Sequence, residues 1–328
     1  MKTLRIWFGC ALGLALSMLF DWSYGFFAIM LPLFMLGKMD KFSFAAHAMV
    51  FVSAVWTTLQ ATFLIELFQS QPVLLTVMVG IMMLVNCIAM MKPTTYLFGF
   101  VGLFVGSIVL SFASYDFIDI EDFNVNLWVI TVANIGVCAL AYYLFPEQPQ
   151  STREKINTPV KQDKDYTAQV ALGWVVVMVA FIVFQVADLY DSLSALASII
   201  ILLTPMTLAG SMGVAKIRII GTGLGCMAGA AVQISLGRWF GNGMLFWLAF
   251  TIAMGWFCHW QTKGEIKSAI GFSAMSALAV PLTTSLVPEQ QDAFFSILYR
   301  FSSIFVAVTL TVMLIWVVHH WLRVCWLR

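Results

Sequence analysis

Arg300 lies about two turns into the last apolar segment of the chain, which otherwise reads as a membrane-spanning helix. An arginine does not deprotonate, and its insertion into a bilayer costs about 2.5–3.5 kcal/mol, so it faces a partner or a wet cavity. One interpretation is a cationic contact for an anionic substrate. The other is a structural pair with Asp292, Asp188 or Asp191, or a side chain that extends to the membrane surface.

Other polar side chains also fall within or beside apolar segments. Gln60, Gln185 and Gln233 are amides that could contact a substrate, although interhelical hydrogen bonding is the usual role of such groups in membranes. Asp188 and Asp191 follow the seventh apolar segment and could take up the protons that drive transport. A solvated outer loop is the simpler explanation of these two carboxylates.

The stretch from 198 to 233 combines a proline, two basic residues and a glycine repeat. We expect an apolar helix interrupted at Pro205, a short turn that carries Lys216 and Arg218, and then a second apolar helix. Glycines recur every four residues along this second helix: Gly221, Gly225 and Gly229. Small residues at this spacing allow close helix packing, and a broken helix beside a tightly packed one is a common construction for a binding site at membrane depth.

The composition excludes several classes of protein. The 328 residues are 61% hydrophobic and only 10% charged, with a mean hydropathy of +0.93, which indicates a membrane protein. The net charge of +1, without a basic run, gives no support for a nucleic-acid partner. No Cys-x-x-Cys pair, His-Glu-x-x-His motif or nucleophile–base pair is present. We therefore expect no enzymatic activity, no metal and no cofactor.

Apolar runs of about 17–25 residues, the length that crosses a bilayer, occur on both sides of a polar linker. The second and eighth runs contain Pro32 and Pro205, and either could enter the membrane without crossing it. We expect an all-α polytopic membrane protein of about twelve transmembrane helices, near 6–20, 24–37, 43–65, 73–91, 95–114, 124–145, 168–187, 193–210, 217–236, 243–260, 266–287 and 294–321.

The charge distribution predicts the orientation. With the N-terminus in the cytoplasm, all of the 17 Lys and Arg residues except Arg238 and Arg300 fall in inner segments, while acidic residues lean outward. Positive residues concentrate on the cytoplasmic side of membrane proteins. Removing any one helix would destroy this alternation, so the pattern favours twelve spans with both termini in the cytoplasm.

The linker 146–167 contains three prolines and mixed charge, which is typical of a solvated connector. It separates a first six-helix membrane repeat, 1–145, from a second, 168–328. Pro32 and Pro205 occupy similar places in the two halves, and so do Gly99 and Gly271. Two six-helix repeats would be parallel, because each has an even number of spans, and sites in such proteins usually lie at the repeat interface.

The segment KIRIIGTGLGCMAGAAV at 216–232 resembles the fusaric-acid-resistance family, also described as the aromatic acid exporters. That family has a proline-containing helix, a basic turn and R-x-x-G-T-x-x-G at the start of the next helix. Tyr299-Arg300 resembles the arginine of its sixth helix. The openings LRIWFGCALGLAL and FAIMLPLFML look like a compact branch without large cytosolic domains. The positions here that match the first motif are Pro205, Arg218, Gly221, Thr222 and Gly225.

The resemblance implies export of organic acids, aromatic acids in particular, across a bacterial inner membrane, together with a periplasmic adaptor of the membrane-fusion type. It places Pro205 and Arg218 beside Arg300 among the substrate-binding residues. The first half lacks counterparts of Arg218 and of the glycine repeat, so we expect an asymmetric site. A passive organic-anion channel and a non-transporting scaffold subunit are the alternatives. Membrane lipid is an expected partner, and homo-oligomerisation stays open.

Overall fold

A computed structural model gives the fold, and it describes residues 1–112, 119–146, 166–187, 193–236, 239, 242–284 and 293–326. Most of the predicted linker and the two predicted coupling residues, Asp188 and Asp191, lie outside the described residues. The expectation of an all-α chain is confirmed for the described part, which forms helices α1 (Lys2–Leu19), α2 (Phe26–Lys38), α3 (Phe44–Phe68), α4 (Pro72–Met91), α5 (Tyr96–Phe112), α6 (Ile120–Leu144), α7 (Tyr166–Val186), α8 (Leu193–Leu202), α9 (Leu208–Leu236), α10 (Gly243–Trp260), α11 (Gly264–Thr284) and α12 (Ala293–Trp326).

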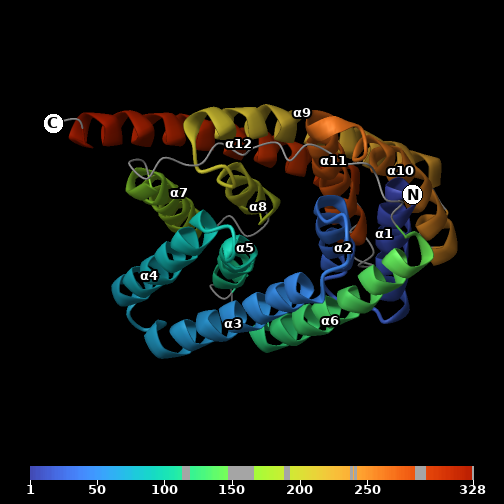
Figure 1. The fold of residues 1–328 in the computed structure, drawn as a ribbon, viewed down its shortest axis with the longest axis horizontal. Helices are drawn as coiled ribbons and strands as arrows, with labels where there is room; N and C mark the ends of the chain where they lie inside the picture. The colour runs from blue at the N-terminus through green and yellow to red at the C-terminus, as the bar shows by residue number, and fades with distance from the viewer. Residues whose placement is uncertain are drawn as a thin grey trace. The chain divides into compact units, whose positions relative to one another are not determined.

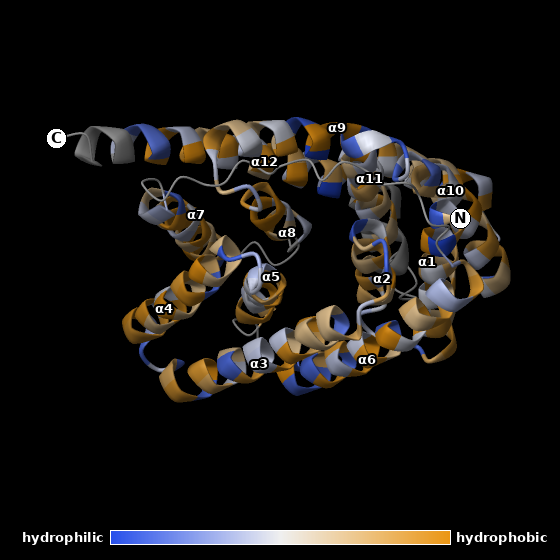
Figure 2. Ribbon diagram, in the orientation of Figure 1, coloured by the Kyte–Doolittle hydropathy of each residue, from blue (hydrophilic) through white to orange (hydrophobic). Residues whose placement is uncertain are grey.

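The chain is a multi-pass membrane protein. Eight of the described helices are long and apolar enough to cross a bilayer: α1, α3, α4, α6, α7, α9, α10 and α12. Large apolar side chains stand exposed on them, such as Ile252 at 67% and Trp256 at 68%, as lipid-facing positions would. Apolar residues dominate α4 and α5 in Figure 2. The count of twelve spans stays a prediction, because α11 is not among these eight helices and α2, α5 and α8 have only 13, 17 and 10 residues.

The predicted eighth segment, 193–210, is wrong in its extent. Helix α8 ends at Leu202 and α9 begins at Leu208, so the expected turn around Lys216 and Arg218 does not exist. Both residues lie inside α9. At 1.5 Å per residue, α8 is about 15 Å long, which is half the thickness of the hydrocarbon core.

The chain breaks at Pro205 because proline has no N–H to donate and disfavours a helical residue before it. Met206, which follows, has a φ of +47°, in the left-handed region that ends a right-handed helix. The hydroxyl of Ser211 donates to the Leu202 carbonyl at 2.9 Å and thus satisfies an acceptor at the end of α8. Pro32, by contrast, lies inside α2, so the two prolines occupy different local structures.

One compact unit comprises Met1–His47, Val125–Ser151 and Lys216–Ile304. Helices α1 and α2 lie side by side in it (Figure 1), α10 packs against α1 and α11, and α11 also contacts α2. The indole N–H of Trp7 on α1 donates to the Thr251 carbonyl of α10 at 2.7 Å. Gly271 of α11 packs closely on α10, since a Cβ at this position would lie 2.9 Å from the Phe257 carbonyl oxygen.

The second compact unit comprises Ala48–Asn124, Thr152–Ala215 and Phe305–Arg328. Here α4 packs against α5 and α7, and α8 packs against α5 and α7. The indole N–H of Trp174 on α7 donates to the Gly80 carbonyl of α4 at 2.7 Å. Gly99 of α5 packs closely on α4, where a Cβ would lie 2.5 Å from the Asn86 carbonyl oxygen.

Neither unit coincides with a half of the chain. The first combines α1 and α2 with α10 and α11, and the second combines α4 and α5 with α7 and α8. Four of the five boundaries between the units fall inside the long helices α3, α6, α9 and α12, and the fifth falls between residues 151 and 152. The predicted repeats 1–145 and 168–328 stay a prediction, because a repeat of the sequence need not form a compact unit by itself.

Candidate functional site

Arg218 is buried in α9, with 5% of its surface exposed. Its Nη1 donates to the hydroxyls of Ser276 at 2.6 Å and Ser273 at 3.2 Å, both on α11. The hydroxyl of Ser276 in turn donates to the Ser273 carbonyl at 2.8 Å. These two partners of Nη1 are neutral hydroxyls, so the hydrogen bonds to them cancel none of the guanidinium's charge.

The glycine repeat of α9 lies against the same face of α11. A Cβ at Gly221 would meet Ser273 and lie 2.9 Å from the Ile270 carbonyl oxygen. A Cβ at Gly225 would meet the Ala274 carbonyl and lie 2.9 Å from the Cβ of Ala277. A Cβ at Gly229 would have its nearest neighbour, the Cδ1 of Leu278, at 3.6 Å, which is an ordinary van der Waals contact. Only the first two glycines are therefore required for the close approach that places Arg218 next to the serines of α11.

We expect Gly225→Ala to destabilise the protein by about 1–3 kcal/mol, because the added methyl group forces α9 away from α11. The matched change Gly229→Ala adds the same methyl group where space exists and should be close to neutral. Thermal unfolding of the detergent-purified protein, followed by tryptophan fluorescence, measures both. Equal melting temperatures for the two variants would contradict this account of the α9–α11 contact.

Arg300 of α12 belongs to the same group of helices. The side chain of Cys226, which is 7% exposed, lies within electrostatic range of both Arg300 and Arg218. Around this thiol, Ala277 and Ile297 form a buried apolar cluster, against which Phe301 packs. We use the name Cys226 cluster for six residues together: Arg218, Cys226, Ala277, Ile297, Arg300 and Phe301. The fold thus brings together two arginines that are 82 positions apart in the sequence.

The other sequence-predicted residues are divided between the units. Gln233 is on α9 in the unit that contains Arg300, and its buried Oε1 has no hydrogen-bond partner among the described residues. Gln60, Gln185 and Pro205 belong to the other unit. Gln185 donates through Nε2 to the Leu110 carbonyl at 3.3 Å, which is an interhelical hydrogen bond of the ordinary kind. The predicted residues do not converge on one side-chain cluster within either unit.

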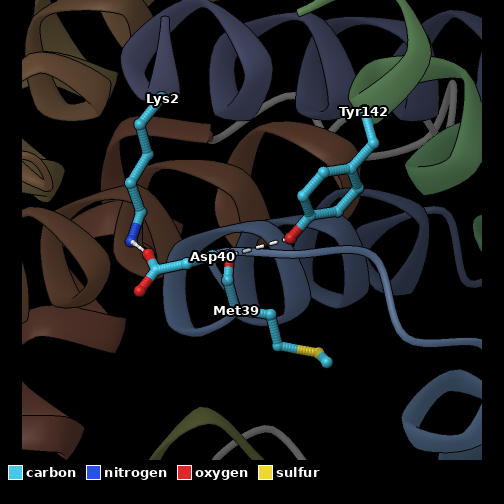
Figure 3. A network of polar contacts seen from close by, with 4 residues as sticks. All are labelled: Lys2, Met39, Asp40 and Tyr142. Carbon is cyan, nitrogen blue, oxygen red and sulfur yellow. Dashed lines mark hydrogen bonds and ion pairs between the residues drawn. The ribbon is translucent and has the colours of Figure 1, made fainter. Parts of the chain in front are cut away.

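Sequence reasoning missed a second arginine site, which lies at the start of α1. Arg5 is 1% exposed, and its guanidinium carbon lies 4.2 Å from the centre of the Tyr142 ring. Figure 3 shows the neighbouring network, in which Tyr142 donates to the Met39 carbonyl at 2.7 Å and Lys2 pairs with Asp40 at 2.9 Å. A signal existed, because Arg5 stands directly at the start of an apolar run. The charge distribution alone assigns Arg5 to the inner positive residues and says nothing of its burial.

Comparison with known proteins adds one match. A model for the family described as "Protein of unknown function (DUF2955)" matches residues 2–141, from the start of α1 through most of α6. The matched part includes Arg5 but ends before Arg218 and Arg300. No curated protein and no solved structure matches the chain. These comparisons do not bear on the resemblance to the aromatic acid exporters.

Proposed function

We propose that this protein exports organic acids, aromatic acids in particular, across a bacterial inner membrane. It would work as the membrane subunit of an efflux system that includes a periplasmic adaptor. The observation that carries the proposal is the Cys226 cluster, where the positive side chains of Arg218 and Arg300 both lie within electrostatic range of the buried Cys226 inside a bundle of apolar helices. Arg218 is buried and Arg300 is half-buried, and ionisable side chains within spanning helices mark ion and substrate pathways.

The charge of the Cys226 cluster favours anions. Two positive side chains in a medium of low dielectric constant create a positive potential that attracts a carboxylate and repels cations. The two serine partners of Arg218 are neutral and hold the guanidinium in place through hydrogen bonds that do not cancel its charge. The apolar wall of Ala277, Ile297 and Phe301 would suit the ring of an aromatic acid.

Two parallel repeats are part of the proposal, and recurring contacts support them. Trp7 and Trp174 make the same indole-to-carbonyl hydrogen bond, each to a helix from the other half of the chain. Gly99 of α5 and Gly271 of α11 likewise both pack closely against the backbone of the preceding helix, α4 and α10 respectively. The acceptor residues Thr251 and Gly80 are 171 positions apart, and the two glycines are 172 apart. A duplicated ancestor whose repeats exchanged helices accounts for this agreement.

Export is tested with the purified protein reconstituted in vesicles that contain radiolabelled benzoate. We expect benzoate to leave against its gradient when a proton gradient is imposed and to stop when an uncoupler is added. Flux that follows the benzoate gradient and ignores the uncoupler would indicate the passive channel. Absence of any flux, with or without the adaptor, would support the scaffold subunit and contradict the proposal.

The proposed orientation places Lys92 in the cytoplasm and Asp119 in the periplasm, on the two sides of α5. Both residues are exposed. We expect single cysteines introduced as Lys92→Cys and Asp119→Cys, in a background without the native cysteines, to react with a membrane-impermeant maleimide from opposite sides. Labelling of both from the same side would show that the 17 residues of α5 do not cross.

A further inference from the structure

Two nitrogens of Arg5, Nε and Nη2, are buried and have no hydrogen-bond partner among the described residues. These two atoms form one edge of the guanidinium group, and their N–H bonds point in the same direction. A carboxylate or phosphate presents two oxygens at matching spacing and accepts both hydrogen bonds at once. Arg5 thus presents two parallel N–H donors, on Nε and Nη2, that an anion with two adjacent oxygens could accept.

The guanidinium is held in a fixed orientation. The ring of Tyr142 covers one of its faces at 4.2 Å, and the Tyr142 hydroxyl is anchored to the Met39 carbonyl at 2.7 Å. Phe42 packs edge-on against the same ring, with 5.8 Å between the ring centres. A guanidinium positioned in this way loses little freedom when it binds a ligand, which favours affinity.

The neighbouring groups leave the site positively charged. The carboxylate of Asp40 is bound to Lys2 at 2.9 Å. His47 is 2% exposed, and its ring centre lies 4.8 Å from that of Phe42. Its Nδ1 lies 2.8 Å from the Ser43 carbonyl oxygen. A carbonyl only accepts, so Nδ1 carries the proton of that bond, and the buried Nε2 has no partner among the described residues. The first turn of α1 adds backbone N–H groups and the positive end of a helix dipole.

We propose that Arg5, held by Tyr142, binds an anionic group with two adjacent oxygens at the α1 end of its compact unit. The group is a carboxylate or a phosphate, carried by a soluble anion or by a lipid headgroup. Leaving two charged N–H donors buried without acceptors is costly, and such an anion would satisfy both. The site is separate from the Cys226 cluster and does not depend on the proposed export.

The experiment measures ligand-induced changes in melting temperature and in tryptophan fluorescence of the full chain, where Trp7 lies near Arg5 on α1. The probes are benzoate, inorganic phosphate and, as a chloride control, sodium chloride at equal ionic strength. A parallel arm compares nanodiscs of phosphatidylcholine with nanodiscs that also contain phosphatidylglycerol. We expect saturable stabilisation by at least one oxyanion and none by chloride. The soluble probes and the lipid arm distinguish the two sources.

Variants of Arg5 and of other basic residues distinguish binding through the paired N–H donors from attraction by positive charge alone. Arg5→Lys keeps the charge but loses the paired N–H groups, and it should weaken binding at least about tenfold. Lys41→Gln removes one exposed positive charge near the same helix ends and should leave binding unchanged. Arg300→Ala should leave the response to inorganic phosphate unchanged, even where export of benzoate is lost. Wild-type protein that responds to no oxyanion, or Arg5→Lys protein that binds as wild type does, would overturn the proposal.

Discussion

Replacing Arg300 by alanine is expected to reduce benzoate export at least about tenfold, while the amount of protein in the membrane stays the same. The change removes one of the two positive charges of the Cys226 cluster. A tenfold loss corresponds to about 1.4 kcal/mol, a modest value for a charged contact in an apolar surrounding. Export by vesicles with matched protein content, measured over a range of benzoate concentrations, gives the result.

The matched control for Arg300 is Ser302→Ala on the same helix. Ser302 is exposed, and its hydroxyl donates to the Leu298 carbonyl of α12 at 2.9 Å, so its loss should affect neither export nor folding. Arg300→Lys keeps the charge and should retain part of the transport. Export by Arg300→Ala at the wild-type rate would remove Arg300 from the substrate site and leave it a packing or interfacial residue.

Replacing Arg218 by alanine is expected to have a double effect. Truncation of this buried side chain leaves a void between α9 and α11 and should destabilise the protein by about 2–5 kcal/mol, as other large-to-small changes in cores do. It also removes the second positive charge of the Cys226 cluster, so export should fall at least as far as in Arg300→Ala. Thermal unfolding and vesicle export, measured on the same preparation, give the two effects.

Ser276→Ala separates these two effects of Arg218. It removes the 2.6 Å hydrogen bond to the guanidinium but keeps the charge. A hydrogen bond to a charged group contributes about 1.5–3 kcal/mol, so stability should fall clearly. Export per folded molecule should fall much less than in Arg218→Ala. If Ser276→Ala and Arg218→Ala reduce export equally, the role of Arg218 is to hold α9 against α11 and not to attract the substrate.

Much of the secondary structure could be predicted because hydropathy and chain length act locally. Helix α10 has the predicted bounds, and α4 differs from its prediction by a single residue. Helix α8 ends earlier than the predicted segment, because the chain breaks at Pro205 and α9 then continues through Lys216 and Arg218. A charged side chain does not end a helix when a neighbouring helix supplies hydroxyl partners, and those partners are distant in the sequence.

The candidate site was predictable only in part. Arg300, Arg218 and the glycines of α9 were recognisable as individual features because charge and small size stand out in an apolar sequence. Their meeting around Cys226 was not, since it depends on how α9, α11 and α12 pack. Arg5 was missed for the same reason. Its burial depends on Tyr142, which is 137 positions away.

The sequence by itself determined that this is an all-α membrane protein, because long apolar segments with few charges are stable only where lipid replaces water. It also determined where most helices begin and end. Only the tertiary structure decided which helices share a compact unit, that each unit draws on both halves of the chain, and which arginines are buried. The physical reason is that helices associate through the shapes of their surfaces and a few polar contacts, and hydropathy along the chain records neither.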